Sequence, residues 1–162
     1  RHGALLVVDE AHGLGVRGSG GQGLLHEVGL AGAPDVVMTT TLSKALGSQG
    51  GVVLGPEAVR AHLIDAARPF IFDTGLAPAS AGAALGALRQ LVARPELAAR
   101  TREVAARLAD IVGVEVPAGA VLSVPMPSPR SAVSAVDAAR RSVAVALPRR
   151  RPVDARRPHR RS

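Results

Sequence analysis

The sequence contains no cysteine, tryptophan or tyrosine, and its only two aromatic residues are Phe70 and Phe72. The lack of cysteine excludes a disulfide framework and a thiolate metal site, and it fits a reducing, cytoplasmic location. Because large rings are so rare, the core must be built mainly from alanine, valine and leucine. No apolar run approaches the roughly 18 residues that cross a membrane, so we expect no membrane partner.

Basic residues gather at the C-terminal end of the sequence. Residues 140–162 hold nine arginines and one acid, Asp154, whereas residues 1–139 hold 11 basic and 12 acidic side chains. The net charge of +7 is therefore a property of this end. Residues 141–162 are rich in arginine and proline and lack any helical or strand period, which predicts a disordered tail or the product of a shifted reading frame. No aromatic residue lies among these arginines, so we expect no nucleic-acid partner.

Short apolar runs alternate with helical patterns along the chain. Strands are predicted at residues 4–8, 35–40 and 51–55, and the first is typical of a parallel strand covered on both faces. Helices are predicted at residues 24–28, 57–67, 78–92, 95–112 and 131–140. We expect residues 70–72 to be extended, and residues 114–116 and 120–124 to form strands of a smaller unit. The alternation predicts an α/β fold with a mostly parallel sheet and flanking helices.

Two short polar segments follow the first two predicted strands: Asp9-Glu10-Ala11-His12 and Thr41-Leu42-Ser43-Lys44-Ala45-Leu46-Gly47. Open α/β sheets bind their ligands at the carboxyl ends of the strands, where both segments lie. Lys44 is the only lysine in the chain. A lysine that forms a Schiff base, a carboxylate for the ring nitrogen and a nearby imidazole are the groups that pyridoxal phosphate needs. The alternatives at this point are a surface lysine, a strand-capping aspartate and a structural histidine.

Other patterns give weaker indications. Asp-Glu-Ala-His also occurs in nucleic-acid helicases, but their phosphate loop is absent from this sequence, and the helicase interpretation leaves the segment around Lys44 unexplained. Residues 13–18 and 18–23 both fit Gly-x-Gly-x-x-Gly, yet neither leads into a clear helix, which disfavours a dinucleotide site. The glycines instead predict that the backbone passes close to a cofactor or partner. The five histidines show no metal-ligand spacing, so no metal is expected.

The motifs together resemble one enzyme family. Residues 8–15, the glycine-rich residues 18–23, residues 39–47 and the pair Gly50-Gly51 are similar, in this order, to the α-oxoamine synthases, which are fold-type I pyridoxal phosphate enzymes. The similarity covers about residues 4–125 and joins several motifs, which makes it far more specific than any one of them. It implies a partial fold-type I large domain.

The resemblance implies a role for five residues. Asp9 would pair with the pyridine nitrogen of the cofactor, and His12 would hydrogen-bond its phenolic oxygen. Lys44 would be the Schiff-base lysine and the base that takes the α-proton of the amino acid. Thr41 would contact the cofactor phosphate. Thr74 would bind phosphate across a dimer interface, because its segment resembles the one that reaches the neighbouring subunit's site.

The resemblance also implies a reaction and its partners. The similarity is greatest to the members that condense L-alanine with pimeloyl-CoA or a pimeloyl carrier protein, releasing CO2, in biotin biosynthesis. The protein would then be a pyridoxal phosphate-dependent C-acyltransferase that works as a homodimer with its site at the interface. The alternatives are the glycine-using members, which make aminolevulinate or 2-amino-3-ketobutyrate, and a truncated remnant without catalytic activity.

The sequence departs from the family pattern in its extent. Family members are more than twice as long, and the first half of their large domain, with its phosphate loop and ring-stacking residue, has no counterpart here. The sequence also does not begin with Met, which predicts a start farther upstream. We assign residues 1–112 to the C-terminal part of the large domain, residues 113–140 to an incomplete small domain and residues 141–162 to the tail. No arginine for the substrate carboxylate can be matched, so we expect the isolated chain to be inactive.

Overall fold

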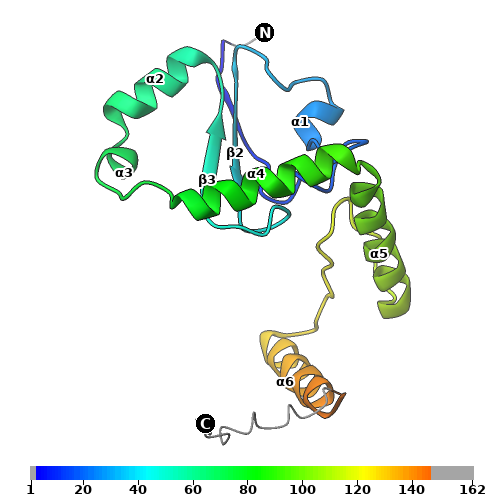
Figure 1. The fold of residues 1–162 in the computed structure, drawn as a ribbon. Helices are drawn as coiled ribbons and strands as arrows, with labels where there is room; N and C mark the ends of the chain where they lie inside the picture. The colour runs from blue at the N-terminus through cyan, green and yellow to red at the C-terminus, as the bar shows by residue number, and fades with distance from the viewer. Residues whose placement is uncertain (1–2, 147–162) are drawn as a thin grey trace, which may run out of the picture. The chain divides into compact units, whose positions relative to one another are not determined.

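The structure of the chain is a computed structural model that describes residues 3–146 (Figure 1). Within this described part, the chain divides into two compact units, with the boundary after residue 123. The first unit contains β1 (Leu6–Asp9), α1 (Leu24–Glu27), β2 (Val36–Thr41), β3 (Gly51–Leu54), α2 (Glu57–Ala66), α3 (Arg68–Ile71), α4 (Pro78–Ala93) and α5 (Glu96–Val112). The second contains α6 (Pro129–Ala146). No helix in the described residues is both long and apolar enough to span a membrane.

The three strands form one sheet in the order β1-β2-β3. Strands β1 and β2 run parallel, with Asp9 opposite Thr39. Strand β3 runs antiparallel to β2, with Gly51 opposite Thr41. The predicted α/β class is therefore confirmed, but the described sheet is mixed rather than mostly parallel. The link from Thr41 to Gly51 is too short for a parallel crossover, which takes about a dozen residues or more.

The loop after β2 supplies much of the core. Leu42 and Leu46 are buried against Ala84 of α4, and Leu14 and Val52 pack around them. This packing holds the loop that carries Lys44 against α4, so the main chain on both sides of the lysine is fixed by apolar contacts.

Strand β1 lies at the outer edge of the sheet and is poorly covered. Leu6 and Val7 are 44% and 61% exposed. The prediction that this strand is covered on both faces is thus wrong for the described residues, because the sheet has only three strands and β1 pairs with β2 alone.

The glycine-rich segment of residues 13–23 packs against the chain itself. Gly15 has φ +78°, and a Cβ atom there would lie 2.4 Å from the Cβ of Ala45. Gly21 has φ +80°, and a Cβ atom there would lie 3.3 Å from the Cβ of Ala98. The glycines therefore allow the loop to lie between the Lys44 segment and α5, as only residues without a side chain can.

A buried carboxylate supports the same loop. Glu10 is 2% exposed, and its Oε1 accepts a hydrogen bond of 2.6 Å from the N–H of Leu25 in α1. A Cβ atom on Gly13 would lie 1.7 Å from Oε2 of Glu10, so the glycine leaves the room that this carboxylate occupies. The Asp-Glu-Ala-His sequence thus contains a structural acid, Glu10, next to the two residues with predicted chemical roles.

Helices α4 and α5 confirm the helices predicted from Pro78 and from Pro95. Helix α5 ends at Val112 and is capped by Gly113, which has a left-handed φ of +74° and donates its N–H to the carbonyl oxygens of Ala109 and Asp110. This is the usual way in which glycine closes a helix.

Three local predictions are wrong. Residues 114–116 and 120–124 form no strands, because an isolated short strand needs a hydrogen-bonded neighbour and the described residues provide none. Residues 70–72 are not an extended segment, because Phe70 and Ile71 belong to helix α3, which has Pro69 in its first turn, where proline is well tolerated.

The C-terminal part differs from prediction in its boundaries. Helix α6 runs from Pro129 to Ala146 and so extends into the segment predicted as a tail, while residues 147–162 lie outside the described part of the chain. The boundary between the two units follows Ser123, whereas the sequence predicts a domain boundary after residue 112. The assignment of these parts to a large and a small domain stays a prediction.

Candidate functional site

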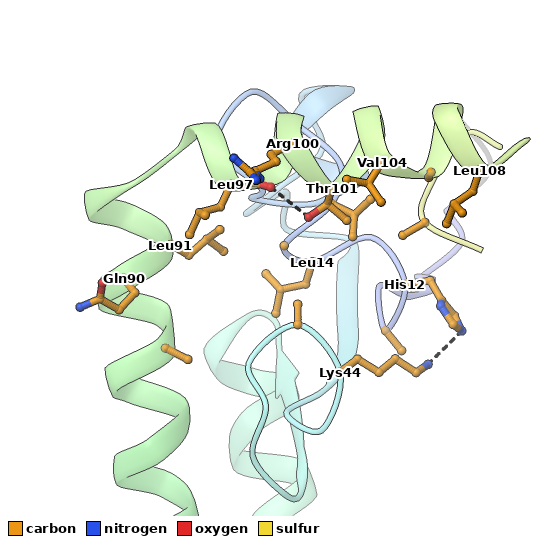
Figure 2. A pocket seen from close by; sticks show the side chains of 17 residues that line it. His12, Leu14, Lys44, Gln90, Leu91, Leu97, Arg100, Thr101, Val104 and Leu108 are labelled. Carbon is orange, nitrogen blue, oxygen red and sulfur yellow. Dashed lines mark hydrogen bonds between the residues drawn. The ribbon is translucent and has the colours of Figure 1, made fainter. Parts of the chain in front are cut away.

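Two predicted site residues come together at the carboxyl end of the parallel strands. His12 follows β1 and Lys44 follows β2, and the lysine Nζ lies 3.0 Å from the histidine Nε2 (Figure 2). Both side chains are exposed. An ammonium group can only donate, so Nε2 accepts this hydrogen bond when the imidazole is neutral with its proton on Nδ1. The pair thus joins an amine and an imidazole on segments that are 32 residues apart.

Asp9 presents a carboxylate at the same edge of the sheet. It is the last residue of β1, it is exposed, and its Oδ1 accepts a hydrogen bond of 2.7 Å from the N–H of Ala11. This local bond fixes the direction of the carboxylate and turns the chain toward His12. The strand-capping role considered from the sequence is therefore present, and a role toward a ligand stays a prediction.

Thr41 closes β2 and forms a small cluster of hydroxyl groups. Its Oγ1 lies 2.7 Å from the Oγ of Ser43, accepts the N–H of Ser43 at 3.2 Å and donates to the carbonyl of Gly50 at 3.3 Å. Sequence reasoning missed Ser43, although it directly precedes Lys44. The hydroxyls order the turn that leads from β2 to the lysine.

The structure does not bring Thr74 to these residues. Thr74 lies in the exposed link between α3 and α4, and its N–H donates to Oδ1 of Asp73 at 2.8 Å. Its action on the site of a neighbouring subunit stays a prediction. Among the described residues no group of three acidic or histidine side chains could hold a metal ion.

A groove of about 950 Å³ opens beside Lys44 and His12 (Figure 2). One wall is formed by the glycine-rich loop and the Lys44 segment, and the other by α4 and α5. Its lining is mainly apolar and includes Leu14, Leu91, Val104 and Leu108. A groove with an apolar wall and a few polar groups at one place is the usual form of a small-molecule site.

An ion pair outside the groove holds the glycine-rich loop to α1. The Nη2 of Arg17 lies 2.5 Å from Oε1 of Glu27, and the N–H of Gly18 donates to Oε2 at 3.0 Å. The N–H of Gly18 and the Arg17 guanidinium hold the pKa of Glu27 below its ordinary value of 4.5, against an opposing effect of desolvation.

A second arginine ties this loop to α5. Arg102 donates from Nη1 to the carbonyl oxygens of Val16 and Gly18. The first arginine, Arg17, makes a further long-range contact, because its Nη1 donates to the carbonyl oxygen of Ala118 at 2.7 Å. No sequence pattern signals these contacts, because they join residues 84 to 101 positions apart.

The lowered pKa of Glu27 gives a pH-dependent contribution to stability. A carboxylate whose pKa is depressed on folding stabilises the native state above its unfolded pKa, and this contribution disappears as the pH falls through the folded value. We expect Glu27→Gln to lower the melting temperature at pH 7, and the difference from wild type to shrink below about pH 4.5. Thermal unfolding at pH 7 and pH 3 measures both.

The control for this experiment is Glu103→Gln, which changes an exposed glutamate of α5. Its melting temperature should follow that of the wild type at both pH values. A deficit of Glu27→Gln that is as large at pH 3 as at pH 7 would show that the ion pair is not its cause.

Comparison with known proteins identifies the family. The model of the aminotransferase class I and II family matches residues 1–160, nearly the whole chain. The chain belongs to this family. Members of the aminotransferase class I and II family use pyridoxal phosphate, which confirms the fold and the cofactor class inferred from the motifs.

The relatives within the family are α-oxoamine synthases. The 8-amino-7-oxononanoate synthase of Mycolicibacterium smegmatis is 72% identical over 139 residues, which are 85% of this chain and 36% of the relative. The enzyme of the same name from Mycobacterium tuberculosis is 70% identical over 139 residues, which again are 85% of this chain and 36% of the relative. The resemblance stated from the sequence is therefore confirmed. The chain spans little more than a third of the length of these relatives.

Solved structures support the same placement. The 8-amino-7-oxononanoate synthase of Francisella tularensis superposes with a TM-score of 0.68 at 29% identity, covering 85% of this chain and 43% of that one. A serine palmitoyltransferase variant of S. paucimobilis, with pyridoxal phosphate and myriocin bound, superposes with a TM-score of 0.69 at 28% identity, covering 80% of this chain and 35% of that one. This aminotransferase-family chain thus has part of the fold found in α-oxoamine synthases.

Proposed function

We propose that this chain is part of an 8-amino-7-oxononanoate synthase, a pyridoxal phosphate-dependent C-acyltransferase of biotin biosynthesis. The observation that carries the proposal is the 3.0 Å pair of Lys44 and His12 at the joint end of two parallel strands. Identities of 69–72% to relatives named 8-amino-7-oxononanoate synthase support this member over the glycine-using ones. The substrates would be L-alanine and a pimeloyl thioester of coenzyme A or of a carrier protein.

The residues present fit pyridoxal phosphate by their chemistry. Lys44 offers an exposed primary amine for the aldehyde, and Asp9 offers an exposed carboxylate for a protonated ring nitrogen. His12 would bond the phenolic oxygen, and the hydroxyl of Thr41 would contact the phosphate. When bound, pyridoxal phosphate supplies an electron sink that weakens the bonds to the α-carbon of an amino acid.

The reaction would join the α-carbon of alanine to the acyl carbon of the thioester. The thiol leaves, and the carboxyl group of alanine is lost as CO2. We assign the removal of the α-proton to the Nζ of Lys44 acting as an amine base. The Nε2 of His12 lies 3.0 Å from this amine, and a hydrogen bond between them would orient it.

We further propose that the protein is a cytoplasmic homodimer. The link that carries Thr74 also contains Phe72 and Leu76, which are 76% and 42% exposed. Apolar side chains gathered at one exposed segment favour burial against another protein surface. A second copy of the chain would cover them and would bring Thr74 to the cofactor phosphate of the neighbouring site.

Product analysis tests the proposed function. The protein that contains this chain, loaded with pyridoxal phosphate, is expected to release CO2 and to form 8-amino-7-oxononanoate from L-alanine and pimeloyl-CoA, with glycine as a much poorer substrate. Mass spectrometry of the amino ketone distinguishes the alternatives. A preference for glycine would assign the chain to the other α-oxoamine synthases, and no C–C bond formation with either amino acid would reject the proposal.

A further inference from the structure

One face of α5 forms an apolar wall of the groove. Leu97, Thr101, Val104 and Leu108 all line it, and they recur every three or four residues, so they share one side of the helix. Val104 and Leu108 remain 49% and 47% exposed. The helix also carries the buried alanines Ala98, Ala105 and Ala109.

The groove is chemically different at its two ends. Figure 2 shows Leu108 on the side of the groove where His12 and Lys44 lie, whereas Arg100 lies toward the start of α5. Leu108 follows Arg100 by eight positions in the helix, which corresponds to about 12 Å along the axis. The groove therefore has an amine and an imidazole at one end, aliphatic side chains along its length and a guanidinium at the other end.

Arg100 is available for a ligand. It is exposed, it lines the groove, and it forms no salt bridge within the part of the chain that the structure describes. A guanidinium matches the geometry of a carboxylate and can donate two parallel hydrogen bonds to it.

The product for which the relatives are named has groups that match the two ends and the apolar wall of the groove. 8-Amino-7-oxononanoate has a nine-carbon chain with an amino ketone near one end and a carboxylate at the other. The new bond lies at the amino ketone, so the acyl donor must bring a saturated chain that ends in the carboxylate. Such a donor needs a reactive group at one end of its site, an apolar wall and a cation at the far end.

We propose that the groove binds the acyl chain of the thioester, with Val104, Leu108 and Leu14 against its methylene groups and Arg100 on its terminal carboxylate. This inference rests on the proposed function. Arg100 then favours the carboxylated donor, because only that donor offers the guanidinium a charged hydrogen-bond acceptor. The aliphatic wall alone does not distinguish a carboxylated chain from a plain one of the same length.

The test compares two donors and two arginine variants in the protein loaded with pyridoxal phosphate. Pimeloyl-CoA and heptanoyl-CoA have acyl chains of equal length, and only the first ends in a carboxylate. We expect Arg100→Gln to raise the KM for pimeloyl-CoA about 10- to 100-fold and to leave the KM for heptanoyl-CoA unchanged. Arg107→Gln is the control, because Arg107 is an exposed arginine of α5 that does not line the groove. This variant should change the KM for neither donor.

Binding in the absence of alanine separates the inference from the proposed function. Calorimetric titration of both donors reads Kd without turnover. A preference for pimeloyl-CoA that Arg100→Gln abolishes supports the inference even if no amino ketone is formed, and that outcome would reject the proposed function alone. Product formation with an unchanged preference in Arg100→Gln would overturn the inference alone.

A third variant tests the apolar wall. Val104→Trp fills the groove and is expected to weaken the binding of both donors at least tenfold, while the circular dichroism spectrum stays that of the wild type. If Val104→Trp leaves both Kd values unchanged, or if Arg100→Gln weakens both donors equally, the groove is a packing surface for another part of the protein and the inference is wrong.

Discussion

Replacing Lys44 by alanine is expected to remove both the covalent attachment of pyridoxal phosphate and at least about 10³-fold of the activity, since this one amine serves as attachment point and base. Treatment with pyridoxal phosphate and borohydride, followed by peptide mapping, measures the attachment directly. Lys44 is the only lysine of the chain, so a reduced adduct on a lysine side chain of this chain can arise at no other position.

Lys44→Arg is the matched control. It keeps the positive charge near His12 but cannot form the bond to an aldehyde. We expect no adduct in either variant and a clear adduct in the wild type. Labelling confined to the chain terminus in all three proteins would contradict the assignment of Lys44. Because labelling needs no substrate, the experiment also applies to the isolated chain, for which we expect no turnover.

Replacing Gly15 by alanine is expected to lower the free energy of unfolding by about 2–6 kcal/mol, from backbone strain of about 1–3 kcal/mol and overpacking of similar size. Both causes are present at this position. Gly15 has a left-handed φ of +78°, and the new methyl group would lie 2.4 Å from the Cβ of Ala45. Urea unfolding of the variant measures the loss.

Gly29→Ala isolates the contribution of the backbone. Gly29 has φ +73°, and a Cβ atom there would meet no other atom within 4 Å, so its replacement introduces strain without a collision. We expect a loss of about 1–2 kcal/mol for this variant. Gly15→Ala should in addition weaken the binding of pyridoxal phosphate, because Ala45 directly follows Lys44. Equal losses in both variants would show that the contact between Gly15 and Ala45 has little effect.

The proximity of Lys44 and His12 could be predicted from the sequence because it depends on local rules. Two apolar strands, each followed by a polar segment, place those segments at one edge when the strands run parallel. Helices α4 and α5 could also be predicted from local signals. Pro78 and Pro95 mark their starts, and Gly113 marks the end of α5.

Other features of the fold could not be predicted, because they depend on contacts between distant parts of the chain. Arg102 donates to carbonyl oxygens of the glycine-rich loop 84 and 86 residues away, and no local pattern predicts this. The burial of Glu10 could not be predicted either, because it depends on the position of Leu25. The strands predicted at residues 114–116 and 120–124 are wrong for the same reason, since a strand also needs a partner that its own sequence does not specify.

Helix α5 contacts two parts of the site at once. Arg102 and Ala98 contact the glycine-rich loop, and Val104 and Leu108 line the groove. A rigid helix cannot turn about its axis or slide without moving both sets together. A displacement of α5 that widened the groove would also move Arg102 relative to the loop that follows His12. One helix therefore supports both a wall of the groove and the loop next to the imidazole.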